Sequence, residues 1–425
     1  MRGASGAAVL ACALLTGCAA GAQEPGATTL RVVLADDWAG APVITEAIES
    51  FEQQWPGTRV QVDGVPFSQV PEAVTAAAEL GEPYDLAHWH AFAAAAAGLA
   101  APVDERWDAA GIAPEQLLPG AVVDVTWDSR RYGLPLDVNA LVLLANGDRL
   151  REAGLAPAEL RTLDGFATAA PALADLPSTD HALVVTASSW SAYGWILARG
   201  GQVLELAPDG TAALDEAGLP TFTFQHPGTI AALEQLVALV TSGAAPPPLA
   251  PDLATSAVGS FADGRAALLA SGSWDLPGTG RAASSATDPA VEVLVLPLPQ
   301  LDPDQPRTVL GGSSLFLPVD ARNPELAFEL ARHLTSREVG VALVAAEGRL
   351  PARRDAYTHP DLPDTPKFRA VIAELEHAWV MPLIAYPEVA TAFRDGLEAV
   401  LSLRSSPREA MAEVQRVAER WRAAA

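Results

Sequence analysis

Apolar and polar positions near the start of the chain alternate in a way that predicts a strand, helix, strand, helix, strand order. Strands are expected at residues 28–35, 59–65 and 84–89, where branched and aromatic side chains are frequent. Between them, residues 43–55 and 69–80 place apolar side chains at helical spacing, which predicts two amphipathic helices. This alternation is typical of a parallel sheet that is covered by helices on both faces.

Polar and aromatic residues follow two of these predicted strands. Asp36, Asp37 and Trp38 come directly after the first strand, and Trp89 and His90 come at the end of the third. Ligands of open α/β sheets bind beyond the carboxyl ends of the strands, so we expect these residues near a ligand site. The two aspartates are also consistent with a solvated pair at the start of a helix, an interpretation that the sequence leaves open.

The rest of the chain predicts a helical region followed by a return to strands. Residues 161–243 are expected to form helices around one strand at 182–186, and Trp190 opens an aromatic helix. Residues 261–277 predict a short helix, a glycine turn and a buried strand that ends at Trp274, which is well placed to face a ligand. Further strands are predicted at 291–299 and 308–318, and helices at 323–335, 368–377 and 389–403.

Four stretches resemble segments of bacterial extracellular solute-binding proteins, family 1, the sugar-binding components of ABC importers. They are F-A-D-G-R-A-A-L-L-A-S-G-S-W at 261–274, Y-G-L-P at 132–135 with A-N-G-D at 145–148, N-P-E-L-A-F-E-L-A-R-H-L-T-S-R-E at 323–338, and G-R-L-P-A-R at 348–353. In the second stretch, Ala145 stands where the family usually has Tyr, and Gly147 stands where it usually has Lys. The order of these motifs along most of the chain carries the resemblance.

The resemblance implies an α/β, two-domain fold of the periplasmic-binding-protein kind (type II), with two lobes built from discontinuous segments. The chain is expected to cross between the lobes three times, near residues 135–139, 261–265 and 317–321. Lobe 1 is then expected to hold residues 28–136 and 265–318, and lobe 2 residues 137–264 and 319–425. A chain of 425 residues is long enough for two domains of ordinary size.

A sugar presents an apolar C–H face and a rim of hydroxyl groups, which aromatic rings and hydrogen-bonding side chains can bind together. The resemblance implies that Trp89, Trp190 and Trp274 stack on sugar and that Asn139 in the crossing strand contacts hydroxyl groups. Asp137 lies two residues before Asn139 and therefore on the same face of that strand. Further candidates, which also have plainer structural interpretations, are Gly311, Gly312, Ser313, Arg353 and Tyr386.

The N-terminus has the pattern of a secretory signal. A short apolar run follows Arg2 and ends at Leu-Thr-Gly-Cys, which resembles a bacterial lipobox with Cys18 as the lipidated residue. Residues 1–17 are then expected to be a lipoprotein signal peptide, and residues 18–27 the lipidated cysteine with a flexible tether. Cys12 would leave with the signal, so the folded body has no cysteine and no disulfide. We therefore expect an extracytoplasmic protein of the cell envelope, anchored to a membrane by lipid alone.

The charge balance narrows the range of partners. The formal net charge is -25 and the sequence pI is about 4.5, which argues against nucleic acid because phosphate binding needs clustered Lys and Arg. Half of the residues are hydrophobic, so the chain can bury a substantial core. No cofactor is expected, and the chain is predicted to be a monomer.

The function that fits these features is the solute-binding component of an ABC importer, which closes on a carbohydrate or polyol and passes it to the permease without doing chemistry itself. One alternative keeps the fold but binds a cationic solute such as a polyamine, because Asp36, Asp37 and Asp137 stand near tryptophans. A less favoured alternative is a secreted glycoside hydrolase, which needs two carboxylates across one bond. A metal at His88 and His90 lacks a further ligand at a recognised spacing.

Overall fold

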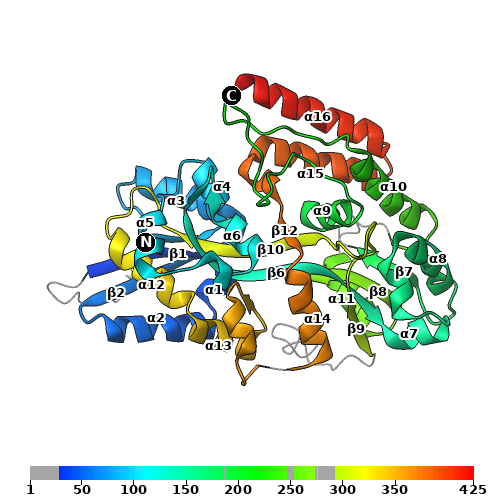
Figure 1. Ribbon diagram of the computed structural model, residues 1–425, viewed down its shortest axis with the longest axis horizontal. Helices are drawn as coiled ribbons and strands as arrows, with labels where there is room; N and C mark the ends of the chain where they lie inside the picture. Colours follow the sequence, from blue (N-terminus) through cyan, green and yellow to red (C-terminus); the bar gives the residue numbers. More distant parts are fainter. Residues whose placement is uncertain (1–27, 186–187, 247–252, 273–274, 276–291, 363) are drawn as a thin grey trace, which may run out of the picture.

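The structure is a computed structural model that describes residues 28–185, 188–246, 253–272, 275, 292–362 and 364–425. One mixed sheet runs through the molecule in the strand order β2-β1-β3-β10-β6-β8-β7 (Figure 1). Its strands are β1 (Thr28–Ala35), β2 (Thr58–Val65), β3 (Leu86–Trp89), β6 (Gly133–Asn146), β7 (His181–Val185), β8 (Ala266–Gly272) and β10 (Thr308–Phe316). Three shorter strands pair beside this path: β9 (Val293–Leu296), β11 (Leu350–Pro351) and β12 (Ala378–Val380). A separate hairpin joins β4 (Thr126–Trp127) to β5 (Arg130–Arg131).

The sheet is parallel at both of its edges, where β7 also runs parallel to β8, and antiparallel in its middle. β1 runs parallel to both β2 and β3, as the alternating sequence predicted. β10 is antiparallel to β3 on one side and to β6 on the other, so the sheet changes direction in its middle. The predicted α/β class is confirmed, and the sheet is mixed rather than purely parallel.

The helices cover both ends of this sheet. Around the first edge lie α1 (Asp36–Ala39), α2 (Pro42–Gln54), α3 (Val70–Glu79), α4 (Ala91–Ala96), α5 (Asp104–Ala110), α6 (Pro119–Asp124), α12 (Pro324–Leu334) and α13 (Arg337–Glu347). Around the other edge and the middle lie α7 (Gly147–Glu152), α8 (Leu163–Ala174), α9 (Ser189–Ala198), α10 (Pro227–Thr241), α11 (Leu253–Ala262), α14 (Pro366–Leu375), α15 (Pro387–Leu401) and α16 (Pro407–Ala424). Short 3-10 turns span Phe67–Gln69, Pro114–Gln116, Pro157–Arg161, Arg354–Thr358 and Pro382–Ala385.

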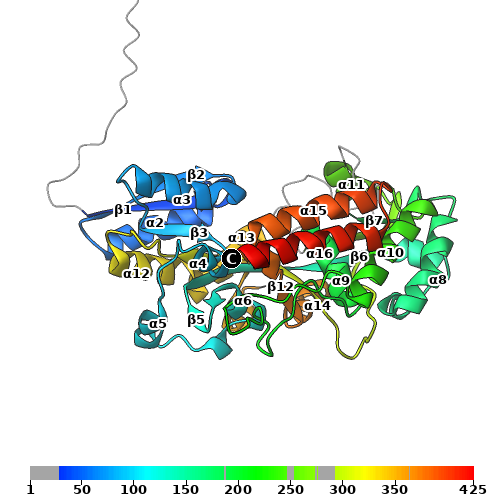
Figure 2. The same cartoon turned by 90° about the horizontal axis from the view of Figure 1, so that it is seen from above.

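Two lobes result, each with its own core. One core gathers apolar side chains of β1, β3, α2, α3, α12 and α13, including the fully buried Phe51 and Trp107. The other gathers side chains of β7, β8, α8, α9, α10, α15 and α16, including the buried Phe166 and Trp195. Figure 2 shows the elongated outline that two lobes side by side produce, with α15 and α16 lying along each other. No helix in the described part of the chain is long and apolar enough to span a membrane.

Two long strands join the lobes. β6 has 14 residues; Gly133 to Ala140 pair with β10, and Leu141 to Ala145 pair with β8. This strand therefore belongs to one lobe at its start and to the other at its end. A nearly continuous apolar run, of which Leu134, Leu136 and Leu141 are examples, keeps it buried, which fits a strand covered on both faces.

The strand pairings bear on the predicted division of the chain, which stays a prediction. β8 pairs with β7 and with the second half of β6, and its apolar side chains belong to the same core as those of β7 and α9. Helices α12 and α13 pack against α2 and contribute to the core of the first lobe, although residues 319–425 were assigned to lobe 2. An apolar face predicts that an element will be buried, but it does not say against which partner.

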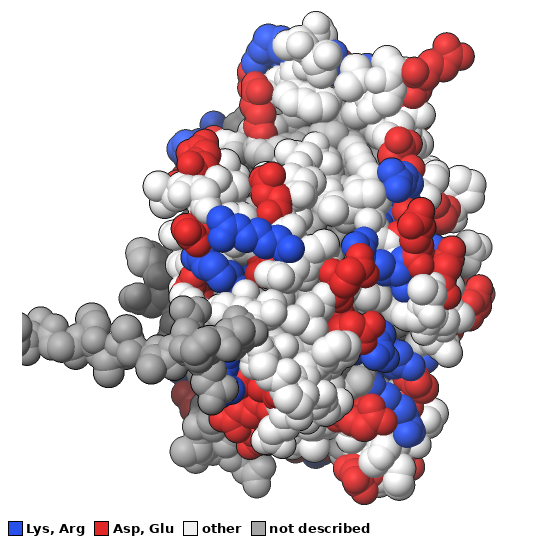
Figure 3. All heavy atoms as spheres, turned by 90° about the vertical axis from the view of Figure 1, so that its left-hand side faces the viewer, with Lys and Arg blue, Asp and Glu red and all other residues white. Residues whose placement is uncertain are grey.

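Charged side chains at the free end of the first lobe occur next to one another with opposite signs (Figure 3). Arg31 lies 3.6 Å from Asp63, Arg59 lies 3.1 Å from Glu52, and Arg106 lies 2.5 Å from Glu325. These exposed pairs contribute little to stability. They do place the basic groups among acidic ones on this face.

Gly133, the first residue of β6, tests how closely the joining strands are packed. A Cβ atom added there would overlap the carbonyl oxygen of Leu315 and lie 2.8 Å from the Cβ atom of Ala91. We expect Gly133→Ala to lower the free energy of unfolding by about 1–3 kcal/mol, because a packed backbone cannot yield without strain. Urea unfolding monitored by circular dichroism measures this change.

Gly259→Ala in α11 is the matched control. A Cβ atom at Gly259 would meet no atom within 4 Å, so alanine should be neutral or stabilising by about 0.5–1 kcal/mol. Equal stability changes in the two variants would contradict the packing described for β6.

Candidate ligand-binding cleft

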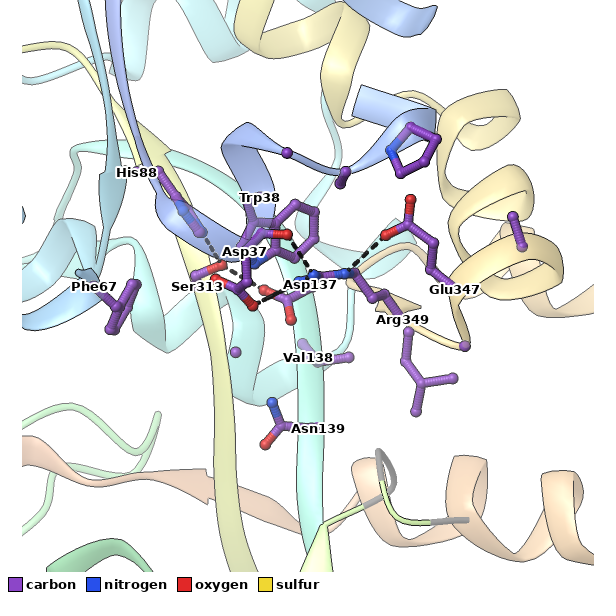
Figure 4. Close-up of a pocket in the computed structure, with 17 residues that line it drawn as sticks. Asp37, Trp38, Phe67, His88, Asp137, Val138, Asn139, Ser313, Glu347 and Arg349 are labelled. Atoms are coloured by element: carbon purple, nitrogen blue, oxygen red, sulfur yellow. Dashed lines mark hydrogen bonds and ion pairs between the residues drawn. The ribbon is translucent and has the colours of Figure 1, made fainter. Parts of the chain in front are cut away.

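A cavity of about 490 Å³ opens where the joining strands meet the first lobe. Its walls come from α1 and the loop after it, the 3-10 turn at Phe67, β3, the middle of β6, the glycine segment of β10, and the segment that leads from α13 to β11 (Figure 4). The described residues that line it are Asp37, Trp38, Gly40, Ala41, Pro42, Phe67, His88, Asp137, Val138, Asn139, Gly312, Ser313, Ala346, Glu347, Gly348, Arg349 and Leu350. A volume of this size is within the range of small-molecule sites.

A chain of hydrogen bonds forms the floor of the cavity. The backbone N–H of Ala35 donates to Nδ1 of His88 at 3.3 Å, so the ring proton is on Nε2. The Nε2–H group of His88 donates to Oγ of Ser313 at 2.5 Å, and the Ser313 hydroxyl donates to Oδ1 of Asp137. Burial lowers the pKa of His88 to about 3, and nearby His90 and Arg349 act in the same direction. His88 is therefore neutral at physiological pH.

Asp137 stands at the end of this chain, facing the cavity. Burial raises its pKa from its ordinary value of 3.8 to about 6; Asp37 and Asp124 add repulsion, while the Ser313 hydrogen bond and Arg349 partly offset the shift. No Arg or Lys side chain of the described residues forms an ion pair with it. A carboxylate that is kept desolvated and without a cation is a common sign of a functional site.

Arg349 forms the opposite wall (Figure 4). Its guanidinium carbon lies 4.1 Å from the centre of the Trp38 ring. Its Nε donates to Glu347 at 3.0 Å, and its Nη2 donates to the carbonyl oxygen of Asp37 at 2.8 Å. The carboxylate of Asp37 accepts from Nη1 and Nη2 at 3.3 Å. Because both carboxylates and the ring hold the guanidinium, its position is fixed before any ligand arrives.

The structure places six of the sequence candidates on this one cavity: Asp37, Trp38, Asp137, Asn139, Gly312 and Ser313. Trp38 is only 4% exposed, with Arg349 over one face and the His88 ring against it at 5.2 Å between centres. Its ring therefore orients Arg349 and offers little surface for stacking. Asn139 is different, since its Oδ1 is buried and accepts no hydrogen bond from a described residue.

Other candidates lie beside the cavity and are held by their own neighbours. Asp36 is exposed at the start of the short helix α1, and a Cβ added to Gly311 would overlap the side chain of Asn139. His90 bonds to Asp124 at 2.6 Å, and the Trp89 ring packs against His90 at 6.0 Å. Trp190 donates from Nε1 to the carbonyl oxygen of Leu310 at 3.1 Å.

Two candidates are engaged farther away, and two lie outside the described residues. Arg353 pairs with Asp355 at 2.8 Å. Tyr386 is 4% exposed within the second core, where its ring lies 5.2 Å from that of Trp421. Trp274 and Cys18 are outside the described residues, so the roles expected for them stay predictions.

Among the cavity residues that were not sequence candidates, those with aromatic or ionisable side chains are Phe67, His88, Glu347 and Arg349. Arg349 was within reach, because the G-R-L-P-A-R motif contains it, but the sequence pointed to Arg353 in the same motif. Nothing in the local sequence of Phe67 marks it as a wall of the site. The described residues contain no group of three or more metal-ligating side chains that could hold a metal ion.

Asp137→Asn should stabilise the ligand-free protein at pH 7.5, raising Tm by roughly 2 °C. Since the native state raises the pKa of Asp137, the ionised carboxylate costs stability at pH values above its unfolded pKa, and the full cost is present above about pH 6. Asparagine keeps an acceptor for Ser313 and removes the charge. The gain should shrink as the pH falls from about 6 toward 3.8 and be absent only below that value, where Asp137 is protonated in the folded and the unfolded states alike.

Differential scanning calorimetry of both proteins across this pH range measures the effect. A variant that is less stable at every pH, or a gain that does not depend on pH, would show that Asp137 is not a desolvated carboxylate.

Comparison with known proteins shows which proteins share this sequence pattern and this architecture. The sequence model of bacterial extracellular solute-binding proteins matches residues 46–370, and no curated protein matches the chain. Among solved structures, the sugar-binding protein MalE from Xanthomonas citri is 21% identical, with a TM-score of 0.77 over 92% of this chain and 97% of that one. Maltose-bound MalE3 from T. maritima is 21% identical, with a TM-score of 0.74 over 92% and 99%.

A third structure, UgpB from Mycobacterium tuberculosis in complex with glycerophosphocholine, is 19% identical, with a TM-score of 0.75 over 93% of this chain and 98% of that one. Identities at this level show a shared two-lobe, periplasmic-binding-protein-like fold, as the sequence motifs implied. The sequence model covers well over half of the chain. The protein belongs to the family of bacterial extracellular solute-binding proteins.

Proposed function

We propose that the protein is the solute-binding component of an ABC importer, which captures a carbohydrate or polyol in the cleft at β6 and β10 and delivers it to the permease. One observation carries this proposal. The cavity combines one partly exposed aromatic ring, Phe67, with polar groups on the strands that join the lobes. Similar structures add support, since MalE3 is bound to maltose and a Listeria monocytogenes substrate-binding protein is in complex with cycloalternan.

The unused hydrogen-bonding groups of the cleft suit hydroxyl groups. Asn139 lines the cleft with its amide nitrogen on the side of Asp137, while its Oδ1 is buried against Gly311 (Figure 4). Arg349 has five N–H donors, of which four bond to Glu347 and Asp37, so one remains for a ligand. A hydroxyl group can accept a hydrogen bond from either side chain, while the ring of Phe67 packs against a C–H face.

We propose that the lobes close around the ligand by bending β6 and β10. Gly312 has a φ of 124°, which other residues rarely adopt, and the pairing register of β10 with β6 shifts between Ser313 and Ser314. The first lobe would include α12 and α13, and the second would hold β7 to β9 with α14 to α16. A ligand that bonds to both lobes would stabilise the closed state through its higher affinity for it.

The location of the protein follows from its N-terminal sequence. We propose that residues 1–17 are a signal peptide, that Cys18 carries the lipid, and that residues 18–27 tether the folded body to the outer side of a membrane. The body would act as a monomer, with the permease as its protein partner. The acidic pair Asp37 and Glu347 is already engaged by Arg349, which argues for binding and against hydrolysis by these carboxylates.

Isothermal titration of the body that starts at Thr28 against mono-, di- and oligosaccharides and polyols tests this function. At least one sugar class should bind, and Asn139→Ala should weaken that binding at least about tenfold, because the ligand loses the hydrogen-bond donor that the amide nitrogen provides. Gln53→Ala is the matched control, because Gln53 is exposed on α2, away from the cleft.

Absence of binding to every sugar and polyol would contradict the carbohydrate assignment, and the family membership would remain. Release of reducing sugar from a bound oligosaccharide would contradict the non-catalytic role.

A further inference from the structure

The charges that line the cleft are unequal. Three carboxylates, Asp37, Asp137 and Glu347, face one cation, Arg349, among the described residues, while His88 is neutral because it is buried. A ligand with a negative charge would add repulsion in a site where charges are poorly screened. The cleft therefore favours neutral or positively charged solutes.

The single cation is not available to offset Asp137. Arg349 forms ion pairs with Asp37 at 3.3 Å and with Glu347 at 3.0 Å, and its ring contact with Trp38 fixes the plane of the guanidinium. Four of its five N–H groups are used in these contacts and in the bond to the Asp37 carbonyl. Arg349 is therefore held by Asp37, Glu347 and Trp38 and does not form an ion pair with Asp137.

Within the described residues, the Asp137 carboxylate has one side-chain hydrogen-bond partner. Oδ1 accepts from the Ser313 hydroxyl, whose own acceptor capacity is used by His88. Because the same hydrogen-bond chain begins at the Ala35 backbone, it holds the carboxylate in place and brings no positive charge to it. Figure 4 shows Asp137 pointing into the cavity above Val138 and Asn139.

Asn139 lies on the same face of β6 as Asp137, and both line the cavity. Its Oδ1 is buried against Gly311, while its amide nitrogen lies on the side of Asp137 (Figure 4). The acceptor that the floor offers to a ligand is therefore the Asp137 carboxylate, and no described cation forms an ion pair with it. A protonated amine, with three donors and no acceptor, can pair with this carboxylate, while the amide nitrogen of Asn139 and the remaining N–H of Arg349 can donate to hydroxyl groups.

We propose that the solute of this cleft is a sugar that carries a protonated amine, and that Asp137 is the residue that selects it. The inference rests on the proposed function, because it names the class of carbohydrate for the same cavity. The ammonium group binds to the Asp137 carboxylate, the ring hydroxyls reach Asn139 and Arg349, and the sugar face packs against Phe67. A ligand that has both a sugar ring and a positive charge can contact the Phe67 ring and the Asp137 carboxylate at the same time.

N-acetylation provides a matched pair of probes, since it removes the charge of an amino sugar and leaves the ring unchanged. Isothermal titration at pH 7 would compare glucosamine and its short β-linked oligomers with their N-acetylated forms, and also with glucose, glucuronate and spermidine. The amine forms should bind at least about tenfold more tightly than the acetylated forms, and glucuronate should bind most weakly. In Asp137→Asn the preference for the amine should fall to within about threefold.

Two further variants keep the test decisive. Glu49→Gln changes the net charge by the same amount at an exposed position on α2, so it should keep the full preference for the amine. Asp137→Glu keeps the charge but moves it, so it should lose affinity and retain the sign of the preference. Circular dichroism of each variant establishes that it is folded before titration.

The outcomes separate this inference from the function on which it rests. Neutral sugars that bind as tightly as the amines, or an amine preference that survives Asp137→Asn, would overturn the inference and leave carbohydrate capture intact. Binding of spermidine with no binding of any sugar would overturn both, as would the absence of any sugar binding.

Discussion

The antiparallel pairing of β6 with β10 is the constraint on which the rest of the molecule depends. These strands connect the lobes, and their contact is so close that side chains are excluded at Gly133, Gly311 and Gly312. The same pairing brings Asp137 and Asn139 on one strand opposite Ser313 and Gly311 on the other. Because the site residues lie on the joining strands, any bend between the lobes changes the geometry of the site directly.

Polar groups that cost stability are concentrated where those strands meet. Asp137 is a desolvated carboxylate, Asn139 has a buried unpaired oxygen, and His88 is kept neutral in the core. The hydrogen bonds from Ala35 to His88, Ser313 and Asp137 fix their positions but do not neutralise the acid. A protein that needed only a stable fold would gain from apolar residues there, so these groups are best explained by a ligand.

The sequence predicted element types and the family fold well, because both depend on local patterns. The strand predicted at 28–35 and the helix predicted at 43–55 match the bounds of β1 and α2 within a residue or two. The pairing of β8 with β7 and the packing of α12 against α2 could not be predicted, since a buried pattern does not name its partner. Helix α16 was missed, although the capping box between Ser406 and Glu409 marks its start.

The site was harder to predict than the fold. Asp137 and Asn139 followed from strand alternation, which has a strict period of two. Arg349 and Trp38 could not be read correctly, because the role of each depends on the other across more than three hundred residues of chain. An exposed tryptophan and one covered by a guanidinium look the same in a sequence, and only the packing separates them.

A change in the distance between the lobes on ligand binding tests the central claim most directly. The body that starts at Thr28 has no cysteine, so single cysteines at Glu49 on α2 and Thr391 on α15, both exposed, can carry two spin labels. Pulsed electron resonance should show a broad distance distribution that shifts by several ångström and narrows when a bound sugar is added. An unchanged distribution at a sugar concentration that calorimetry shows to be saturating would contradict capture by closure of the lobes.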